Sequence, residues 1–249
     1  MPEERTSTTM DAPALSIVIP AYNEAERLPG SLDRLAAFLD AEGHHAEVLV
    51  VDDGSTDATA AVAARLAAAD ARFRLLRAAH RGKGAAVRRG MLAARGAVRV
   101  MCDADFSMPP HELPKLLAPL AVGADLAVAT REGVGARRVG EPLVRHLMGR
   151  VFNALVRLAA VPGLHDTQCG FKAFTAAAAE RLFLRSTIDG FGFDVEILYL
   201  ARKYRLRLAE VPIVWYYQAS SRVSPLRDTI RMVRDVLRVR VNDWRGRYC

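Results

Sequence analysis

The fold is constrained most by a regular alternation of two kinds of segment over the first half of the chain. Short apolar runs bounded by turn residues occupy residues 15–20, 48–52, 73–77, 98–102 and 125–130. Between them lie segments rich in Ala, Leu and Arg with apolar positions at helical spacing, at residues 26–41, 57–69, 83–94 and 111–120. This alternation predicts the α/β class, with a mostly parallel sheet covered by helices on both faces.

The pattern changes after Arg131. A loop rich in Gly and Arg leads to a long apolar helix, a turn through Gly170 and a further helix, followed by a late strand and a final helix; these elements are expected at residues 142–160, 194–204, 206–216 and 225–241. A chain of 249 residues can bury one sizeable core. We therefore expect a disordered tail over residues 1–14, one globular domain over residues 15–222, and a basic amphipathic helix with its tail over residues 223–249.

Composition argues against several classes of protein. The longest mainly apolar stretch, residues 116–130, is shorter than the ~18 residues that a membrane-spanning helix needs, and it contains Asp125. Residues 1–14 lack the apolar centre of a signal peptide. The cysteines have neither disulfide-framework nor zinc-site spacing, which favours a reducing cytoplasm; they are Cys102, Cys169 and Cys249. We expect a cytoplasmic protein whose cysteines are core or tail thiols.

The basic charge is concentrated at the C-terminal end. From Arg202 onward, 12 Lys and Arg residues stand against 4 Asp and Glu residues, whereas the preceding 201 residues contain 23 and 24. Within residues 225–241, an apolar stripe and an arginine stripe recur at helical spacing: Leu226, Ile230, Val233 and Leu237, and Arg227, Arg231, Arg234 and Arg238. Such a helix suits an anionic membrane surface, and it equally suits a helix that packs on its own sheet with a solvated arginine edge.

Asp103 and Asp105 directly follow a predicted strand, with Ala104 between them. Carboxylate oxygens are hard ligands that suit Mg²⁺ or Mn²⁺, and the ligands of parallel sheets gather at the carboxyl ends of the strands. The spacing therefore predicts a site for a divalent cation and a diphosphate. Short acidic motifs of this kind are also common in loops, so a solvated turn or a helix cap is the alternative interpretation.

Polar side chains also follow the earlier strands. Glu24 lies beyond the first strand and Asp53 beyond the second, so both are expected at the edge of the sheet where a nucleotide can bind. Asp53 can accept the imide N–H of a uracil base, whereas Asp52 suits a turn and Asp57 a helix N-cap. Lys83 follows a Gly-containing loop that is not a Walker motif, and its ammonium group can bind a negatively charged ligand.

The order of these motifs resembles that of family 2 glycosyltransferases of the type-A fold, over nearly the whole chain. Three downstream segments narrow the resemblance: Asp166-Thr167-Gln168-Cys169-Gly170-Phe171-Lys172, Gly192-Phe193-Asp194-Val195-Glu196 and Glu210-Val211-Pro212. They are similar to the dolichyl-phosphate β-glucosyltransferases and their bacterial relatives, and more distantly to dolichyl-phosphate mannose synthases. The resemblance implies a Rossmann-like α/β catalytic domain over residues 15–222.

The resemblance also implies an activity: inverting transfer of a hexose, in the first place glucose from UDP-glucose, to the phosphate of a polyprenol. Mg²⁺ or Mn²⁺ on Asp103 and Asp105, with Ser107 as a further ligand, would stabilise the leaving diphosphate. The implied catalytic residues are Asp105, Asp166, Arg131 and Arg145, the two arginines holding the acceptor phosphate. The implied nucleotide-sugar contacts are Pro20, Tyr22, Glu24, Val51, Asp53, Lys83, Asp103 and Ala104.

The acceptor chemistry limits what these residues need to do. A phosphate monoester is mostly dianionic at neutral pH, because its second pKa is about 6, so it needs capture more than deprotonation. Guanidinium groups suit that capture, with ordinary surface arginines as the alternative for Arg131 and Arg145. Asp166 is open to three roles: a base, an orienter of the acceptor, or a turn residue bonded to the backbone that follows it. Asp194 is either functional or a helix N-cap.

Other functions stay open from the sequence. The same fold can transfer mannose from a GDP-sugar, or act on a soluble hydroxyl acceptor with Asp166, Asp194 or Glu196 as general base. A pI near 9.7 also suits a nucleic-acid-binding protein, but the basic excess lies in one terminal segment without a nucleic-acid motif. We expect no nucleic-acid partner. The expected partners are a nucleotide-sugar and a polyprenyl-phosphate lipid, bound by a peripheral protein on the inner face of the cytoplasmic membrane.

Overall fold

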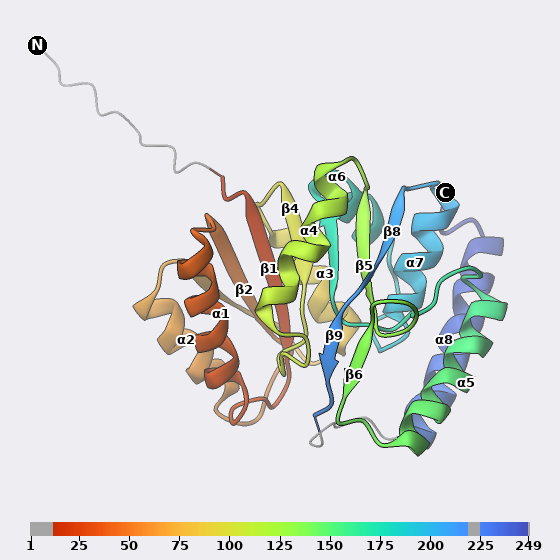
Figure 1. Ribbon diagram of the computed structural model, residues 1–249, viewed down its shortest axis with the longest axis horizontal. Helices are drawn as coiled ribbons and strands as arrows, with labels where there is room; N and C mark the ends of the chain where they lie inside the picture. Colours follow the sequence, from red (N-terminus) through yellow and green to blue (C-terminus); the bar gives the residue numbers. More distant parts are fainter. Residues whose placement is uncertain (1–11, 219–224, 249) are drawn as a thin grey trace, which may run out of the picture.

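The structure is a computed structural model that describes residues 12–218 and 225–248 (Figure 1). Most of the predicted tail, residues 1–11, lies outside the described residues, as does Cys249. At the end of that predicted tail, Ala14 joins the sheet through its backbone: its N–H donates to His45 O, and its carbonyl accepts from Val98 N, each at 3.1 Å. The prediction of a disordered tail therefore stays a prediction for residues 1–11.

A seven-stranded, mostly parallel sheet forms the body of the molecule (Figure 1). Its order is β3-β2-β1-β4-β7-β5-β8, and β6 pairs with β9 in a separate small sheet. The strands are β1 (Leu15–Ala21), β2 (Ala46–Asp52), β3 (Phe73–Arg77), β4 (Val98–Met101), β5 (Leu126–Thr130), β6 (Arg137–Val139), β7 (Lys172–Thr175), β8 (Leu208–Pro212) and β9 (Val214–Tyr216). The helices are α1 (Leu28–Glu42), α2 (Thr59–Ala69), α3 (Lys83–Ala93), the short 3-10 helix η1 (Pro110–Glu112), α4 (Leu113–Ala121), α5 (Leu143–Ala159), α6 (Ala176–Phe183), α7 (Phe193–Lys203) and α8 (Pro225–Trp244).

Apolar side chains form a packed core on each face of the sheet. Because successive strand residues point to opposite faces, Val48 and Val50 of β2 join the core under α1 and α4, whereas Leu49 and Val51 join the core under α3, α6 and α7. Residues on five helices, α3 and α5 to α8, belong to this second core. The predicted α/β architecture, with helices on both faces, is confirmed.

The sequence patterns did not predict β7 and α6. β7 runs antiparallel between β4 and β5, with Lys172 paired to Met101 and Thr175 paired to Val98. Four residues are too few to show a reliable period, and the partners of β7 are distant in sequence. Since β7 is antiparallel, its first residue lies beside the last residue of β4. The segment before Lys172 is therefore brought to the edge of the sheet where Asp103 and Asp105 lie.

The single late strand predicted over residues 206–216 is wrong. The structure has two strands there, β8 paired with β5 and β9 paired with β6. The change of partner comes at Ile213: its N–H donates to Thr130 O at 3.1 Å, at the end of β5, and its carbonyl accepts Arg137 N–H at 3.0 Å, at the start of β6. The consequence is a small second sheet that holds β9 close to the end of β5.

Helix α8 packs on the domain with one of its faces. Val236 and Val239 are buried in the core, and the Asp235 carboxylate accepts the N–H of Gly192. The Asn242 amide donates to Thr187 Oγ1 at 2.9 Å. The helix thus packs on the domain, but not through the predicted apolar stripe: Val233 and Leu237 of that stripe are exposed. The side chains of Leu226, Arg227 and Ile230 lie outside the description. Within the described residues, no helix combines the length and apolar character needed to span a bilayer.

Gly90 of α3 provides a test of how closely this helix packs on the sheet. A Cβ at Gly90 would overlap Val18 Cγ1 and lie 2.8 Å from Val51 Cγ2, whereas a Cβ at Gly30 of α1 would meet nothing within 4 Å. We expect Gly90→Ala to lower the free energy of unfolding by about 1–3 kcal/mol, because the core must move to accept the methyl group. Gly30→Ala should leave it unchanged or raise it by up to about 1 kcal/mol. Urea unfolding of both variants checks this, and equal stabilities would contradict the close packing.

Candidate functional site

The carboxyl ends of β1, β2 and β4 meet at one edge of the sheet, and the predicted strand-end residues lie there. Pro20 and Val51 are register partners on β1 and β2. Asp52 closes β2, and its carboxylate accepts Ser55 N–H at 3.1 Å, as expected of a turn residue. Ala104, buried, follows β4. The topology therefore brings together residues that are more than 80 positions apart in the sequence.

Asp53 holds the loop that leads into α3. Its buried carboxylate accepts Arg81 N–H at 3.0 Å and Gly82 N–H at 2.8 Å, and it lies 2.8 Å from His80 Nδ1. The sequence predicted Asp53 as the acceptor for a base imide. In the structure this carboxylate binds the loop in front of Lys83, and its contact with a base stays a prediction.

Tyr22 and His80 form an aromatic surface beside Asp53. Their rings stack with centroids 4.1 Å apart and 18° between the planes. Glu24, on the same β1 exit, binds the Arg27 guanidinium at 2.6 and 2.7 Å, a pairing that the sequence analysis did not anticipate. Aromatic faces and polar edges of this kind suit a planar base and its ribose.

The carboxylate of Asp103 contacts Lys83 and Gly170. Lys83 Nζ lies 2.6 Å from Asp103 Oδ1. Burial by itself would lower the pKa of Lys83. The nearby carboxylates of Asp103 and Asp194 have the larger effect and raise this pKa above its usual value. A Cβ at Gly170 would overlap the Asp103 carboxylate, so the motif that contains Gly170 packs its backbone directly against the acidic pair.

A buried ion pair lies behind this contact. Lys172, fully buried, donates to Asp194 and to the Cys169 carbonyl, the latter at 2.6 Å. Burial raises the pKa of Asp194, while the charges of Lys172 and Lys83 act in the opposite direction. Of the two alternatives for Asp194, the helix N-cap is wrong, because Gly192 is the N-cap of α7 and the Asp194 carboxylate binds the buried Lys172. The N-cap prediction for Asp57 is wrong as well: Ala58 is the N-cap of α2, and the Asp57 carboxylate, one residue earlier, accepts Thr59 N–H at 2.9 Å.

Asp105 lies in a turn with an unusual backbone. Phe106 has a φ of 45°, in the left-handed region that a bulky residue rarely adopts. The Asp105 carboxylate accepts Ser107 N–H at 3.0 Å, and the Ser107 carbonyl accepts Tyr216 N–H at 2.8 Å. Ser107 is buried. The observed contacts of Ser107 therefore support the turn, and its predicted role as a metal ligand stays a prediction.

The acidic pair fits a divalent cation that is shared with a diphosphate. Among the residues that the structure describes, no cluster of three or more His, Cys, Asp or Glu could hold an ion by itself. Mg²⁺ and similar ions are commonly held by one or two carboxylates, with substrate phosphates and water completing the shell. Asp103 and Asp105 provide these two carboxylates, and Gly170 leaves the space that the Asp103 carboxylate occupies.

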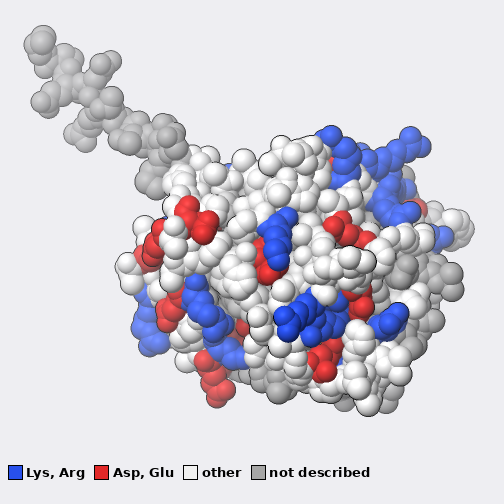
Figure 2. Space-filling view, viewed as in Figure 1, with Lys and Arg blue, Asp and Glu red and all other residues white. Residues whose placement is uncertain are grey.

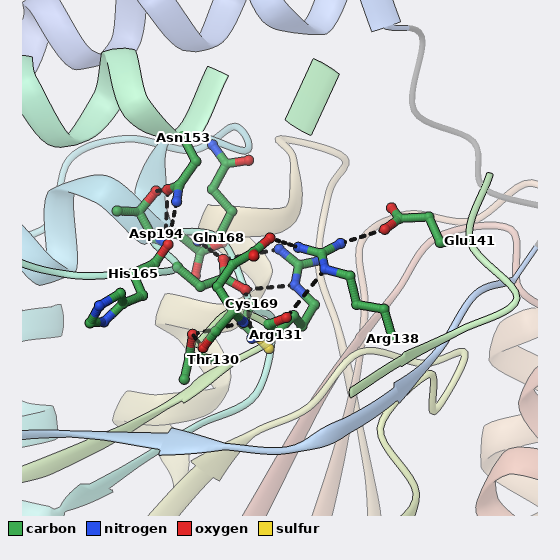
Figure 3. Close-up of polar contacts among 12 residues, drawn as sticks. Thr130, Arg131, Arg138, Glu141, Asn153, His165, Gln168, Cys169 and Asp194 are labelled. Carbon is green, nitrogen blue, oxygen red and sulfur yellow. Dashed lines mark hydrogen bonds and ion pairs between the residues drawn. The ribbon is translucent and has the colours of Figure 1, made fainter. Parts of the chain in front are cut away.

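Arg131 and Asp166 form a second, largely buried ion pair. The guanidinium of Arg131, which is labelled in Figure 3, donates from Nε to Asp166 Oδ2 at 2.6 Å and from Nη2 to Asp166 Oδ1 at 3.0 Å. Burial by itself would raise the pKa of Asp166. The Arg131 guanidinium and the backbone N–H groups of Arg131 and Gln168 have the larger effect, and they hold this pKa well below its usual range. Asp166 therefore orients Arg131 and fixes the turn to Gln168.

Further cationic and aromatic side chains surround this pair. The Arg131 and Arg138 guanidinium groups lie 5.4 and 5.7 Å from the centre of the Trp215 ring, and that of Arg145 lies 5.1 Å from the centre of the Tyr217 ring. Such stacking fixes guanidinium groups in orientation. The Trp215 and Tyr217 rings lie 6.1 Å apart between centroids, so Arg131 and Arg145 lie in one region; their predicted binding of an acceptor phosphate stays a prediction. Arg138 and Trp215 were not among the residues predicted from the sequence, because the proximity of β6 and β9 that places them arises only from the tertiary fold.

The Arg131–Asp166 pair makes a testable contribution to stability. We expect Asp166→Asn to lower the free energy of unfolding by about 3–5 kcal/mol, because it leaves the Arg131 charge without its partner. Asp40→Asn removes a mostly exposed partner of Arg72 and should cost at most about 1 kcal/mol. Urea unfolding at pH 7 compares the two, and a similar loss in both would contradict the assignment.

The pH dependence of stability should change in a defined direction. The pKa of Asp166 is lower in the folded chain than in the unfolded chain, where it is about 3.9, so the pair contributes fully above that value. Its contribution is lost as the pH falls below about 4 toward the folded pKa. Asp166→Asn should therefore lose less stability than the parent over the same acid range.

Comparison with known proteins places this geometry in a family. Residues 16–183 match the model of Glycosyl transferase family 2. A dolichyl-phosphate β-glucosyltransferase of Dictyostelium discoideum is 34% identical over 91% of this chain and 73% of its own length. The enzyme of that name from Drosophila melanogaster is 37% identical over 94% of this chain and 78% of its own length.

Solved structures show the same fold. The glucosyl-3-phosphoglycerate synthase of Mycobacterium tuberculosis bound to UDP superposes with a TM-score of 0.65 at 23% identity, over 91% of this chain and 80% of that one. The complex of that synthase with Mn²⁺, UDP-glucose and phosphoglyceric acid has a TM-score of 0.66 at 24% identity, over 95% and 80% of the two chains. The resemblance inferred from the strand-end and downstream motifs is confirmed: the chain belongs to glycosyltransferase family 2, in the group of the dolichyl-phosphate β-glucosyltransferases.

Proposed function

We propose that the protein transfers glucose from UDP-glucose to the phosphate of a polyprenol, with inversion at the anomeric carbon. One observation carries the proposal: a single short segment, residues 166–172, contacts both halves of the site. Asp166 binds Arg131, which suits an acceptor phosphate, and Gly170 packs against Asp103, which suits a donor diphosphate. The names of the relatives support glucose as the sugar and dolichyl phosphate as the acceptor, and the Mycobacterium tuberculosis synthase of the same fold binds UDP-glucose.

On the donor side, the acidic pair and Lys83 act on the diphosphate. Mg²⁺ or Mn²⁺ held by Asp103 and Asp105 supplies Lewis-acid stabilisation of the leaving nucleoside diphosphate. Lys83 lies within reach of the same charge, since its ammonium group contacts Asp103. The surface of Tyr22 and His80 receives the base, beside the loop that Asp53 holds.

On the acceptor side, the chain supplies guanidinium groups. The acceptor phosphate is mostly dianionic at neutral pH and serves as the nucleophile without losing a proton. Arg131 and Arg145 bind it, and Asp166 keeps Arg131 in orientation. A carboxylate with a lowered pKa is a weak base, which favours the orienting role of Asp166 over the general-base role. Because the acceptor is a lipid, the protein works as a peripheral protein at the cytoplasmic face of the membrane.

An assay of the purified protein tests the proposal. Polyprenyl phosphate is offered with UDP-glucose, UDP-galactose, UDP-N-acetylglucosamine or GDP-mannose, each with Mn²⁺, with Mg²⁺ and with neither. We expect lipid-linked glucose from UDP-glucose, dependent on the cation, and at least a hundredfold less with Asp105→Ala, since the cation contributes several kcal/mol. Asp33→Ala, an exposed acid of α1, is the matched control. Absence of lipid-linked product from every donor would contradict the proposal.

Gly170→Ala tests the contact between the downstream motif and the acidic pair. The added methyl group would overlap the Asp103 carboxylate and displace it from the donor site. We expect UDP to bind at least about tenfold more weakly in the presence of Mn²⁺, because displacements of about 1 Å in such sites are costly. Calorimetric titration measures this, with Gly30→Ala as the control. Unchanged affinity in a folded Gly170→Ala variant would show that the contact has no role in donor binding.

A further inference from the structure

Over residues 231–244, helix α8 has a second face that the described part of the domain does not cover. Opposite the buried Val236 and Val239, four large apolar side chains recur at helical spacing along its outer side. Their exposed fractions are 43% for Val233, 60% for Leu237, 43% for Val241 and 87% for Trp244. An apolar stripe of this length on a water-exposed helix is unusual for a soluble domain and marks a contact surface.

Helix α5 has the same two-sided character. Its inner side belongs to the site: the Asn153 amide oxygen accepts the Thr167 hydroxyl at 2.8 Å, next to Asp166, and the Arg145 guanidinium stacks on Tyr217. Its outer side exposes four large apolar side chains within two turns: Leu143 at 84%, Val144 at 74%, Leu147 at 64% and Met148 at 56%. One helix therefore carries an acceptor-site arginine on one side and an apolar surface on another.

The two helices lie side by side at one end of the molecule (Figure 1). Exposed arginines accompany the apolar stripe of α8: Arg231, Arg234, Arg238, Arg240 and Arg245. Figure 2 shows basic side chains near the C-terminal ends of α7 and α8 and uncharged surface around the N-terminal end of α5. Apolar side chains flanked by guanidinium groups are complementary to a lipid surface with negatively charged headgroups.

We propose that the outer faces of α5 and α8 together form a docking surface for an anionic lipid bilayer. The inference rests on the proposed function, because a polyprenyl phosphate presents its phosphate at the headgroup level. The apolar side chains enter the boundary between headgroups and acyl chains, and the arginines bind the headgroup phosphates. Since α5 carries Arg145 on its other side, docking of this helix brings the acceptor site to the level of the lipid phosphate.

Vesicle binding tests the apolar part of the surface. Full-length protein is sedimented with vesicles of phosphatidylcholine containing about 30% phosphatidylglycerol, and the partition coefficient is measured. Leu147→Glu and Leu237→Glu should each lower it about tenfold or more, as expected from losing one buried leucine side chain. Leu184→Glu alters a leucine of similar exposure, 67%, that lies outside α5 and α8, and should have no effect. Equal binding by all four proteins, or no binding by the parent, would overturn the proposal.

A charge-reversed variant tests the basic part. Arg234→Glu combined with Arg238→Glu should weaken binding to the anionic vesicles at least about tenfold, since each arginine near such a surface contributes about 1 kcal/mol. Raised salt should weaken binding of the parent in the same direction. Identical affinity of parent and variant for anionic vesicles would show that charge has no part in docking.

Turnover separates the docking proposal from the proposed function. With a water-soluble, short-chain prenyl phosphate, the Leu147→Glu and Leu237→Glu variants should match the parent. With long-chain polyprenyl phosphate in vesicles, both should lose most of their turnover. If the parent turns over neither acceptor, the proposed function fails, while the vesicle measurements still decide whether the surface docks on lipid. If both variants keep full turnover on the long-chain acceptor in vesicles, the docking surface has no role.

Discussion

The buried ion pair between Lys172 and Asp194 is the interaction on which the site depends. A charged ammonium group taken out of water is costly unless it is paired and hydrogen-bonded, and here Asp194 and the Cys169 carbonyl both accept from it. The pair joins the start of β7 to the first turn of α7. It thereby fixes where the chain enters the middle of the sheet, and with it the position of the preceding residues.

That fixed entry point connects the two halves of the reaction. In the segment that leads into Lys172, Gly170 packs against Asp103 and Asp166 binds Arg131. Lys83 connects this pair electrostatically to the edge of the sheet, because the charges of Asp103 and Asp194 both raise its pKa. A change in the register of β7 would move the contacts of the cation-binding acids and of the acceptor arginine together. This arrangement explains why the longest recognisable motif of the chain is also the one nearest to the chemistry.

Helices α5 and α8, at one end of the molecule, are each anchored on one face and exposed on the other. α8 is held by Asp235, Asn242 and Tyr248, which contact Gly192, Thr187 and Glu196 respectively. With one face anchored, its outer face is free of the usual requirement to cover a core. α5 shares this property, since its inner face is committed to the loop around Thr167. A lipid acceptor gives these exposed apolar faces a function.

Much of the architecture followed from the sequence, because periodic apolar patterns depend only on neighbours along the chain. The alternating strands and helices up to Thr130, the acidic pair at the end of β4 and the downstream motifs were all evident there. β7 was not, because a four-residue antiparallel strand is defined by its partners in β4 and β5 rather than by its own pattern. The split between β8 and β9 was missed for the same reason.

Residue types and their spacing were enough to predict the class of fold, the family, and which acids lie at the ends of strands. What those acids contact depends on the tertiary fold, in which Asp194 pairs with Lys172 instead of capping a helix and Asp166 binds Arg131. The exposure of the outer faces of α5 and α8 likewise follows from the tertiary fold. The physical reason is that residue type and spacing set a local conformation. The partner of a buried charge, by contrast, is selected by packing between segments that lie far apart in the chain.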